Sequence, residues 1–371
     1  MTRLATATRA FLCLSLASCA TAPGDEVVAD RVTVIDREPG TEIMVGPGRL
    51  VLPTAGNEDL LDRVPGDILV SGRGAGFLRR VVSIQDAAGE IQIATEPAAL
   101  TDAITEAEYD GQVHDAKWDW SGPKFGGVLL GFGGVEMQGN GNAKLTMTKG
   151  SLDFHPQLDL AMTMHRAKIS RFDLVASGVF DAALGFKLET DGAAEIKTSR
   201  DLWASPEWTF VQMVGPVPVV EVVSITVGLE VNASTEGQTS MQVGATAHST
   251  LSAGARFSDG VWHHVGDHTL VLHTDGPTVT STNNAQVKIS MPIELHVQFY
   301  DLAGPYVAIE PSLQAEYKRG EGVTASWGTE AVVGGQVNLL GAGNDSRLLG
   351  IEASLFDFSC DFGTPVRDCL N

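Results

Sequence analysis

The stretch DLVASGVFDAALGFKLE, residues 173–189, alternates between two kinds of position. Every even position from Leu174 to Leu188 holds an apolar residue or glycine, while the odd positions include aspartate, lysine and glutamate. Successive side chains of a β-strand point to opposite faces, so this period of two predicts a strand with one dry and one wet face. A single strand of this length would span about 50 Å. We therefore expect a bend or bulge near Gly178 or Gly185.

The same period of two returns in many other parts of the chain. It is found in residues 152–164, 223–231, 241–257, 285–299, 306–317 and 323–339. Serine, threonine, glutamine, asparagine and glutamate occupy the opposite positions, a pattern typical of antiparallel sheets with one solvated face. Turn sequences such as Asp259-Gly260 separate the runs. Because two dry faces must cover each other, the sequence predicts an all-β protein with a large antiparallel β-sandwich or flattened barrel of long strands.

A small β-rich module is expected in front of this large β domain. We place the module at residues 31–112 and the large domain at residues 113–371. The short apolar runs of the module predict strands at residues 67–70, 77–84 and 91–95. After the last of these runs, Thr95 and Pro97 are typical of a helix start, so we expect a short helix at residues 98–108.

The run GRGAG at residues 72–76 has the glycine content of a phosphate-binding loop. Such loops lead into a helix, whose N-terminus holds the phosphate. Here the run leads into FLRRVVSI, a sequence typical of a strand. The glycines therefore indicate a tight turn between two strands.

Residues 1–18 have the features of an export signal. Arg3 and Arg9 precede a short apolar core at residues 10–17. This core is too short to span a membrane as a mature helix. The signal ends in Leu16-Ala17-Ser18-Cys19, which resembles the lipobox of bacterial lipoproteins. The resemblance implies that Cys19 receives a diacylglyceryl group and becomes the new N-terminus. Residues 19–30, which are small and acidic, then form a tether.

This resemblance also implies a location. Two or three acyl chains exceed the single chain that gives only marginal membrane binding. The residue after Cys19 is Ala20 rather than aspartate, which in lipoproteins of the enterobacterial type favours the outer membrane. We expect an exported protein whose membrane partner is reached through the N-terminal lipid, on the periplasmic or the surface face.

The remaining cysteines fit an exported chain. Cys13 leaves with the signal, and Cys19 is acylated, so Cys360 and Cys369 remain as a pair. An even pair in an oxidising compartment predicts a disulfide. Its small loop would stabilise the folded chain by roughly 2–3 kcal/mol.

The composition excludes some partners. The net charge is −21, from 25 Lys+Arg against 46 Asp+Glu, which disfavours nucleic acid. The segments GPVPVV at residues 215–220 and GPYVAIEP at residues 304–311 resemble β-rich exported proteins of unassigned function, such as those of myxobacteria. That resemblance implies no catalytic residues and no cofactor.

The densest polar cluster is WHHVGDHTLVLH, residues 262–273. His264 and His268 share a face of the expected strand, but about 13 Å separates them along it. Zinc ligands must lie about 2 Å from one metal, so only a bulge at Gly266 would bring the two histidines together. We expect no metal site, with His264 and His268 as the weak candidates.

Paired carboxylates are a second candidate chemistry. Asp153 and Asp159 lie on the polar face of one run, and Asp181 and Glu189 lie on that of another. Glycosidases place two carboxylates about 5–9 Å apart. The G-x-S-x-G motif of serine hydrolases does not occur.

These observations favour a lipid-anchored cell-envelope protein with a non-enzymatic binding or structural role. A carbohydrate-active or other hydrolytic enzyme on a β-sandwich is one alternative. A carrier that holds an apolar ligand between its long sheets is the other. The partners that these three functions imply are a glycan, an apolar ligand or a protein.

Overall fold

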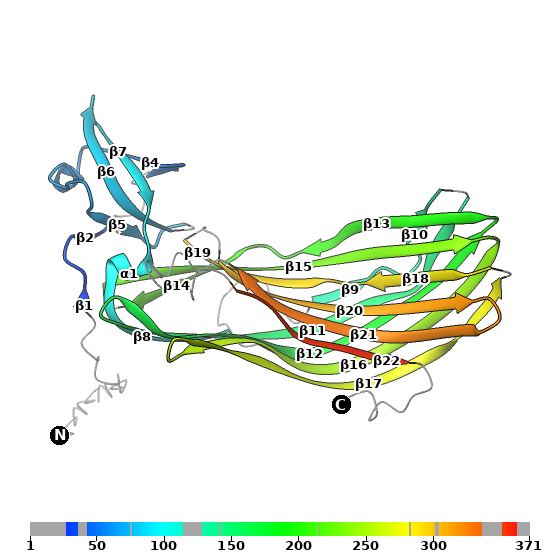
Figure 1. Ribbon diagram of the computed structural model, residues 1–371. Helices are drawn as coiled ribbons and strands as arrows, with labels where there is room; N and C mark the ends of the chain where they lie inside the picture. The colour runs from blue at the N-terminus through cyan, green and yellow to red at the C-terminus, as the bar shows by residue number, and fades with distance from the viewer. Residues whose placement is uncertain are drawn as a thin grey trace, which may run out of the picture.

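The computed structural model describes residues 27–35, 43–74, 76–113, 128–140, 142–214, 216–281, 283–300, 304–335 and 351–361. Strands β1 to β22 make up nearly all of this part of the chain. Figure 1 shows two long sheets that face each other along their length, with a smaller sheet at one end. The predicted all-β sandwich with a small N-terminal β module is confirmed.

The first long sheet has the strand order β1-β8-β11-β12-β16-β17, and β9 and β10 also pair with β11. All of these pairs are antiparallel. The strands are β1 (Val27–Val28), β8 (Ile104–Val113), β9 (Val128–Gly131), β10 (Glu136–Gln138), β11 (Lys144–His165), β12 (Lys168–Thr190), β16 (Thr239–Ser258) and β17 (Val261–Ser281).

The second long sheet has the order β13-β15-β18-β20-β21-β22. In addition, β14 pairs with β15, and β19 pairs with both β15 and β20. Its strands are β13 (Ala193–Ala204), β14 (Trp208–Val214), β15 (Val217–Glu236), β18 (Ala285–Ser290), β19 (Ile293–Phe299), β20 (Pro305–Lys318), β21 (Gly322–Gly335) and β22 (Ile351–Asp361). The run expected as one strand at residues 285–299 is divided into β18 and β19. Pro292 lies at the division, and a proline has no N–H to give to a neighbouring strand.

The core lies between the two long sheets. Phe180, Leu184 and Phe186 of β12 are fully buried, as are Leu313 of β20 and Trp327 of β21. All belong to one continuous apolar cluster that includes residues of both sheets. The face predicted from even positions of residues 173–189 is therefore the buried face of β12.

A bulge occurs near Gly185, but on the neighbouring strand. The register between β11 and β12 shifts between Met147 and Lys149, opposite Phe186 and Gly185. The extra residue changes which positions face the core: Met147 is buried before the bulge and Leu152 after it. No shift occurs at Gly178 in either pairing of β12.

The small sheet has the order β2-β5-β6-β7-β4-β3. Its strands are β2 (Val32–Val34), β3 (Met44–Gly46), β4 (Arg49–Pro53), β5 (Ile68–Ser71), β6 (Phe77–Ala87) and β7 (Glu90–Pro97). The strands expected in the module are present as β5, β6 and β7. Strands β5 and β6 pair antiparallel, and Gly74 and Gly76 of the GRGAG run between them have φ values of +61° and +69°. Residues with such φ values are usually glycine.

The helix expected at residues 98–108 is wrong in extent. Strand β7 continues to Pro97, α1 covers only Leu100–Ala103, and β8 begins at Ile104. Strand β8 forms a ladder with β11, which places Tyr109 opposite Met162. Pairing with a distant strand outweighs the local helix signal here, as tertiary context often does.

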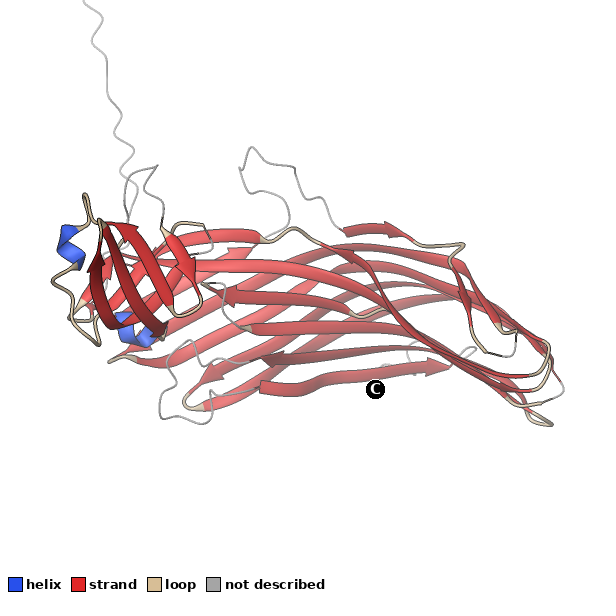
Figure 2. Ribbon diagram, turned by 90° about the horizontal axis from the view of Figure 1, so that it is seen from above, coloured by secondary structure: helices blue, strands red, loops and turns tan. Residues whose placement is uncertain are grey.

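The module packs on the outer face of the second long sheet, at one end of the sandwich. A Cβ atom added to Gly76 would lie 2.5 Å from Cγ2 of Val220, and one added to Gly72 would lie 2.9 Å from Cβ of Pro218. Figure 2 shows this sheet, the 3-10 helix η1 (Glu58–Leu60) and α1 at the same end, while the long strands run away from them. The division at residues 112 and 113 stays a prediction.

None of the helices in the described part of the chain is long and apolar enough to cross a membrane.

Candidate functional site

The expected lipidation and disulfide sites are not assessed by the structure. Cys19 and Cys369 lie outside the described residues, as does the whole of residues 1–18. Cys360 belongs to β22, where its backbone pairs with that of Trp327. Acylation of Cys19 and a disulfide between Cys360 and Cys369 therefore stay predictions.

His264 and His268 lie on the same face of β17, opposite Ala255 and Leu251 of β16. The register passes through Gly266 without a shift, so the bulge that would bring these histidines together is absent from this described pair of strands. Their spacing therefore remains about 13 Å. In the described part of the chain, no group of three or more His, Cys, Asp or Glu side chains could hold a metal ion.

The carboxylates that lie close together in the structure are not the pairs that the sequence analysis grouped. Six residues of strand separate Asp153 from Asp159, which is about 20 Å. Eight separate Asp181 from Glu189, which is about 26 Å. The register of β11 with β12 instead places Asp153 directly opposite Asp181. Local sequence carries no signal for this pair, because register depends on the partner strand.

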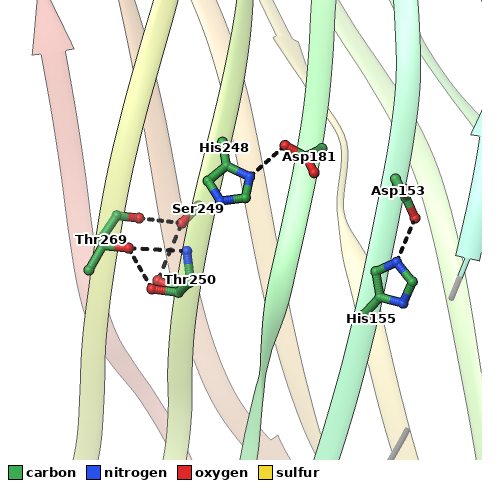
Figure 3. Close-up of polar contacts among 7 residues, drawn as sticks. All are labelled: Asp153, His155, Asp181, His248, Ser249, Thr250 and Thr269. Carbon is green, nitrogen blue, oxygen red and sulfur yellow. Dashed lines mark hydrogen bonds and ion pairs between the residues drawn. The ribbon is translucent and has the colours of Figure 1, made fainter. Parts of the chain in front are cut away.

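Each of these two aspartates has its own histidine, as Figure 3 shows. His155 Nε2 lies 3.1 Å from Asp153 Oδ1, and His248 Nδ1 lies 2.7 Å from Asp181 Oδ1. The four side chains are 43–54% exposed on the outer face of the first long sheet. Two like charges directly opposite each other in a sheet are unfavourable, and here each carboxylate lies against a ring nitrogen of its own histidine.

Ser249 follows His248 in sequence and invites comparison with a Ser-His-Asp triad. The two side chains, however, belong to opposite faces of β16. The Ser249 hydroxyl is buried and donates to the Thr269 carbonyl oxygen at 2.7 Å. A triad needs the nucleophile within hydrogen-bond reach of its base. These residues therefore form no such triad, and the outer face presents a hydroxyl pair, Thr250 and Thr269, beside the aspartates and histidines.

An open pocket of about 440 Å³ lies at the end of the sandwich opposite the module. It is formed where β11 and β16 begin and where β12 and β17 end. It is lined by Asn142, Lys144, Glu189, Thr190, Asp191, Gln238, Thr239, Ser240, Thr280 and Ser281. We call it the tip pocket. Sequence reasoning missed it because common polar residues from separate turns compose it, and only their position in the fold brings them together.

Buried hydroxyl groups form the floor of the tip pocket. Thr190 Oγ1 lies 3.0 Å from the carbonyl oxygens of both Gly192 and Gly237, the glycines of the two adjoining turns. Thr239 Oγ1 donates to the Gly237 oxygen at 3.1 Å and lies 2.9 Å from Ser281 Oγ. Thr190 and Thr239 are almost completely buried. These contacts hold the two turns in fixed positions.

The charges of the tip pocket are compensated locally. Lys144 Nζ lies 2.6 Å from Glu136 Oε1, and Lys187 Nζ lies 2.6 Å from Glu189 Oε1. In the part of the chain that the structure describes, Lys144 is the only cationic residue that lines the pocket. The pocket therefore presents mainly neutral hydrogen-bonding groups, with Asp191 as an exposed carboxylate.

Comparison of this chain with protein families, with curated proteins and with solved structures gives no match.

Proposed function

We propose that this chain is a lipid-anchored cell-envelope protein with a non-enzymatic binding or structural role. The observation that carries the proposal is the placement of two features at opposite ends of one long body. Strand β1, where the described chain begins, lies at the module end, and the tip pocket lies at the other end. The 20 residues of β16 run between these ends, a length of roughly 65 Å at about 3.3 Å per residue.

A lipid on Cys19 would hold the module end close to the membrane, because only residues 20–26 separate it from β1. The tip pocket would then be presented away from the lipid surface. This arrangement suits a protein that contacts a partner at a distance from its own membrane. Localisation to the outer membrane and the Cys360–Cys369 disulfide belong to the same proposal.

Two observations favour binding over the alternatives. The Asp153 and Asp181 carboxylates lie on an exposed sheet face and each points to its own histidine, which does not suit a glycosidase cleft. The space between the long sheets is occupied by the apolar cluster that includes Phe180 and Trp327, which does not suit a carrier with its ligand between the sheets.

The experiment is fractionation of cells that produce the full chain or one of two variants. Cys19→Ala removes the proposed acylation site, and we expect the variant to leave the membrane fraction. Cys13→Ala is the matched control, because it removes a cysteine of the signal that would be absent from the mature chain. The proposal of a lipid anchor fails if Cys19→Ala remains as membrane-bound as the wild type and Cys13→Ala.

A further inference from the structure

The tip pocket offers four polar side chains that the protein does not use itself. Asn142, Gln238, Ser240 and Thr280 line it, and none of their side chains takes part in a hydrogen bond with the described part of the protein. Amide and hydroxyl groups can both donate and accept hydrogen bonds. Such a set complements a ligand that also carries many groups of both kinds.

We propose that the tip pocket binds a neutral saccharide. This inference rests on the binding role proposed above and names the class of ligand for it. Sugar hydroxyls both donate and accept, as the free amides and hydroxyls of the pocket require. The volume of about 440 Å³ lies within the range of roughly 300–1,000 Å³ that is usual for small-ligand pockets.

The charges of the pocket exclude an anionic ligand. Recognition of a carboxylate or phosphate group relies on Arg, Lys or a cluster of backbone N–H groups. Among the described lining residues, the one cation, Lys144, already has Glu136 at 2.6 Å, and Glu189 has Lys187 at 2.6 Å, so Asp191 remains as a carboxylate that would face the ligand. An acidic sugar would therefore meet repulsion, while a neutral sugar would not.

The lining also excludes an apolar ligand. The described residues that line it include no aromatic residue and no large aliphatic residue. An apolar ligand would cover polar groups without replacing their hydrogen bonds to water, which is costly. A saccharide replaces those bonds.

The fixed floor reduces the entropic cost of binding. The Thr190 and Thr239 hydroxyls hold the turns at Gly192 and Gly237 before any ligand arrives. Preformed sites lose less freedom on association. Since neutral hydrogen bonds each contribute little net energy, we expect a dissociation constant on the order of 1 mM for one short saccharide. Many lipid-anchored copies on one surface would strengthen binding to a polymer through avidity.

Saturation-transfer NMR of the full chain with neutral disaccharides tests this proposal. The pocket variant is Gln238→Ala with Ser240→Ala. The matched control is Ser312→Ala with Gln314→Ala, which changes the same residue types, two positions apart, on the half-buried to exposed face of β20 in the other long sheet. A panel of hexuronic acids, which carry a negative charge, serves as the competing class.

We expect the wild type and the control to bind at least one neutral disaccharide and the pocket variant to lose at least about tenfold in affinity. The proposal is overturned if the pocket variant binds as well as the control, if no neutral disaccharide binds, or if only hexuronic acids bind. Sedimentation of the three proteins with isolated cell envelopes separates this result from the wider proposal. Equal binding of all three to envelopes would retain the binding function and reject the tip pocket as its site.

Discussion

At the scale of single residues, Tyr300 is the clearest buried polar group outside the tip pocket. Its hydroxyl donates to the Pro218 carbonyl oxygen, and its backbone N–H donates to the Val220 oxygen at 3.0 Å. Burial raises the pKa of the Tyr300 hydroxyl above its usual value. Pro218 and Val220 also contact the module, so Tyr300 supports the region of β15 on which the module packs.

Tyr300 predicts a loss of stability at alkaline pH. A tyrosine ionises at about pH 10 in the unfolded chain, whereas the raised pKa keeps it neutral in the folded protein. The stabilisation is therefore complete below about pH 10 and is lost as the pH rises above that value. Tyr300→Phe should lose about 1 kcal/mol at neutral pH, because the Pro218 oxygen loses its donor. It should also lose less additional stability than the wild type between about pH 8 and pH 10.5.

Urea denaturation at the two pH values measures both effects. Tyr306→Phe is a matched control, because Tyr306 is a half-buried tyrosine whose ring covers Gly334 on the outer face. The account of Tyr300 would be contradicted if the wild type, Tyr300→Phe and Tyr306→Phe all lost the same free energy of unfolding between the two pH values.

At the scale of elements, β12 and β16 approach so closely that one position requires glycine. A Cβ atom added to Gly254 would lie 2.1 Å from the carbonyl oxygen of Leu174 and 2.7 Å from the Cα atom of Val175. Both obstacles are backbone atoms, which cannot move away as a side chain can. Gly254→Ala should therefore reduce the free energy of unfolding by about 1–3 kcal/mol.

Gly276→Ala on β17 is the control for this prediction. Nothing lies within 4 Å of a Cβ atom at that position, so the change in stability should stay within about 1 kcal/mol. Thermal or chemical denaturation of both variants gives the comparison. Equal stabilities of Gly254→Ala and Gly276→Ala would show that the two strands are not so close.

Two glycines at paired positions of neighbouring strands let one ion pair form across the outer face of the first long sheet. Lys149, Gly185, Gly244 and Asp275 occupy paired positions on four successive strands. Lys149 Nζ nevertheless lies 2.6 Å from Asp275 Oδ2. The two glycines leave the intervening surface free of side chains, so the lysine can extend across it. Register shifts occur at this row on β11, between Met147 and Lys149, and on β16, between Gln242 and Gly244.

The sequence predicts the faces of these elements better than their partners. Alternation within residues 173–189 identifies the buried face, because a strand places successive side chains on opposite sides whatever it pairs with. The pairing of Asp153 with Asp181 depends on register, and the tip pocket depends on turns that are distant in sequence. The helix expected at residues 98–108 failed for the same reason, since pairing with β11 determines the structure of β8. The division at Pro292 has a local cause that the sequence already contains.

At the scale of the whole molecule, the fold separates the ends of a long body. The module and β1 lie at one end, and the tip pocket lies at the other. The two long sheets stabilise this body by burying apolar side chains along its length. A lipid on Cys19 would make that separation useful, because it would present the pocket away from the membrane.

The measurement that tests this account most directly is the intact mass of the protein purified from membranes of the cells that produce it. The account predicts a chain that has lost residues 1–18 and begins with Cys19 carrying a diacylglyceryl group, with or without a further acyl chain. It also predicts that Cys19→Ala shows no such lipid mass. A mature chain without any added lipid, or one that begins at a residue other than Cys19, would contradict the proposed anchor and the orientation that depends on it.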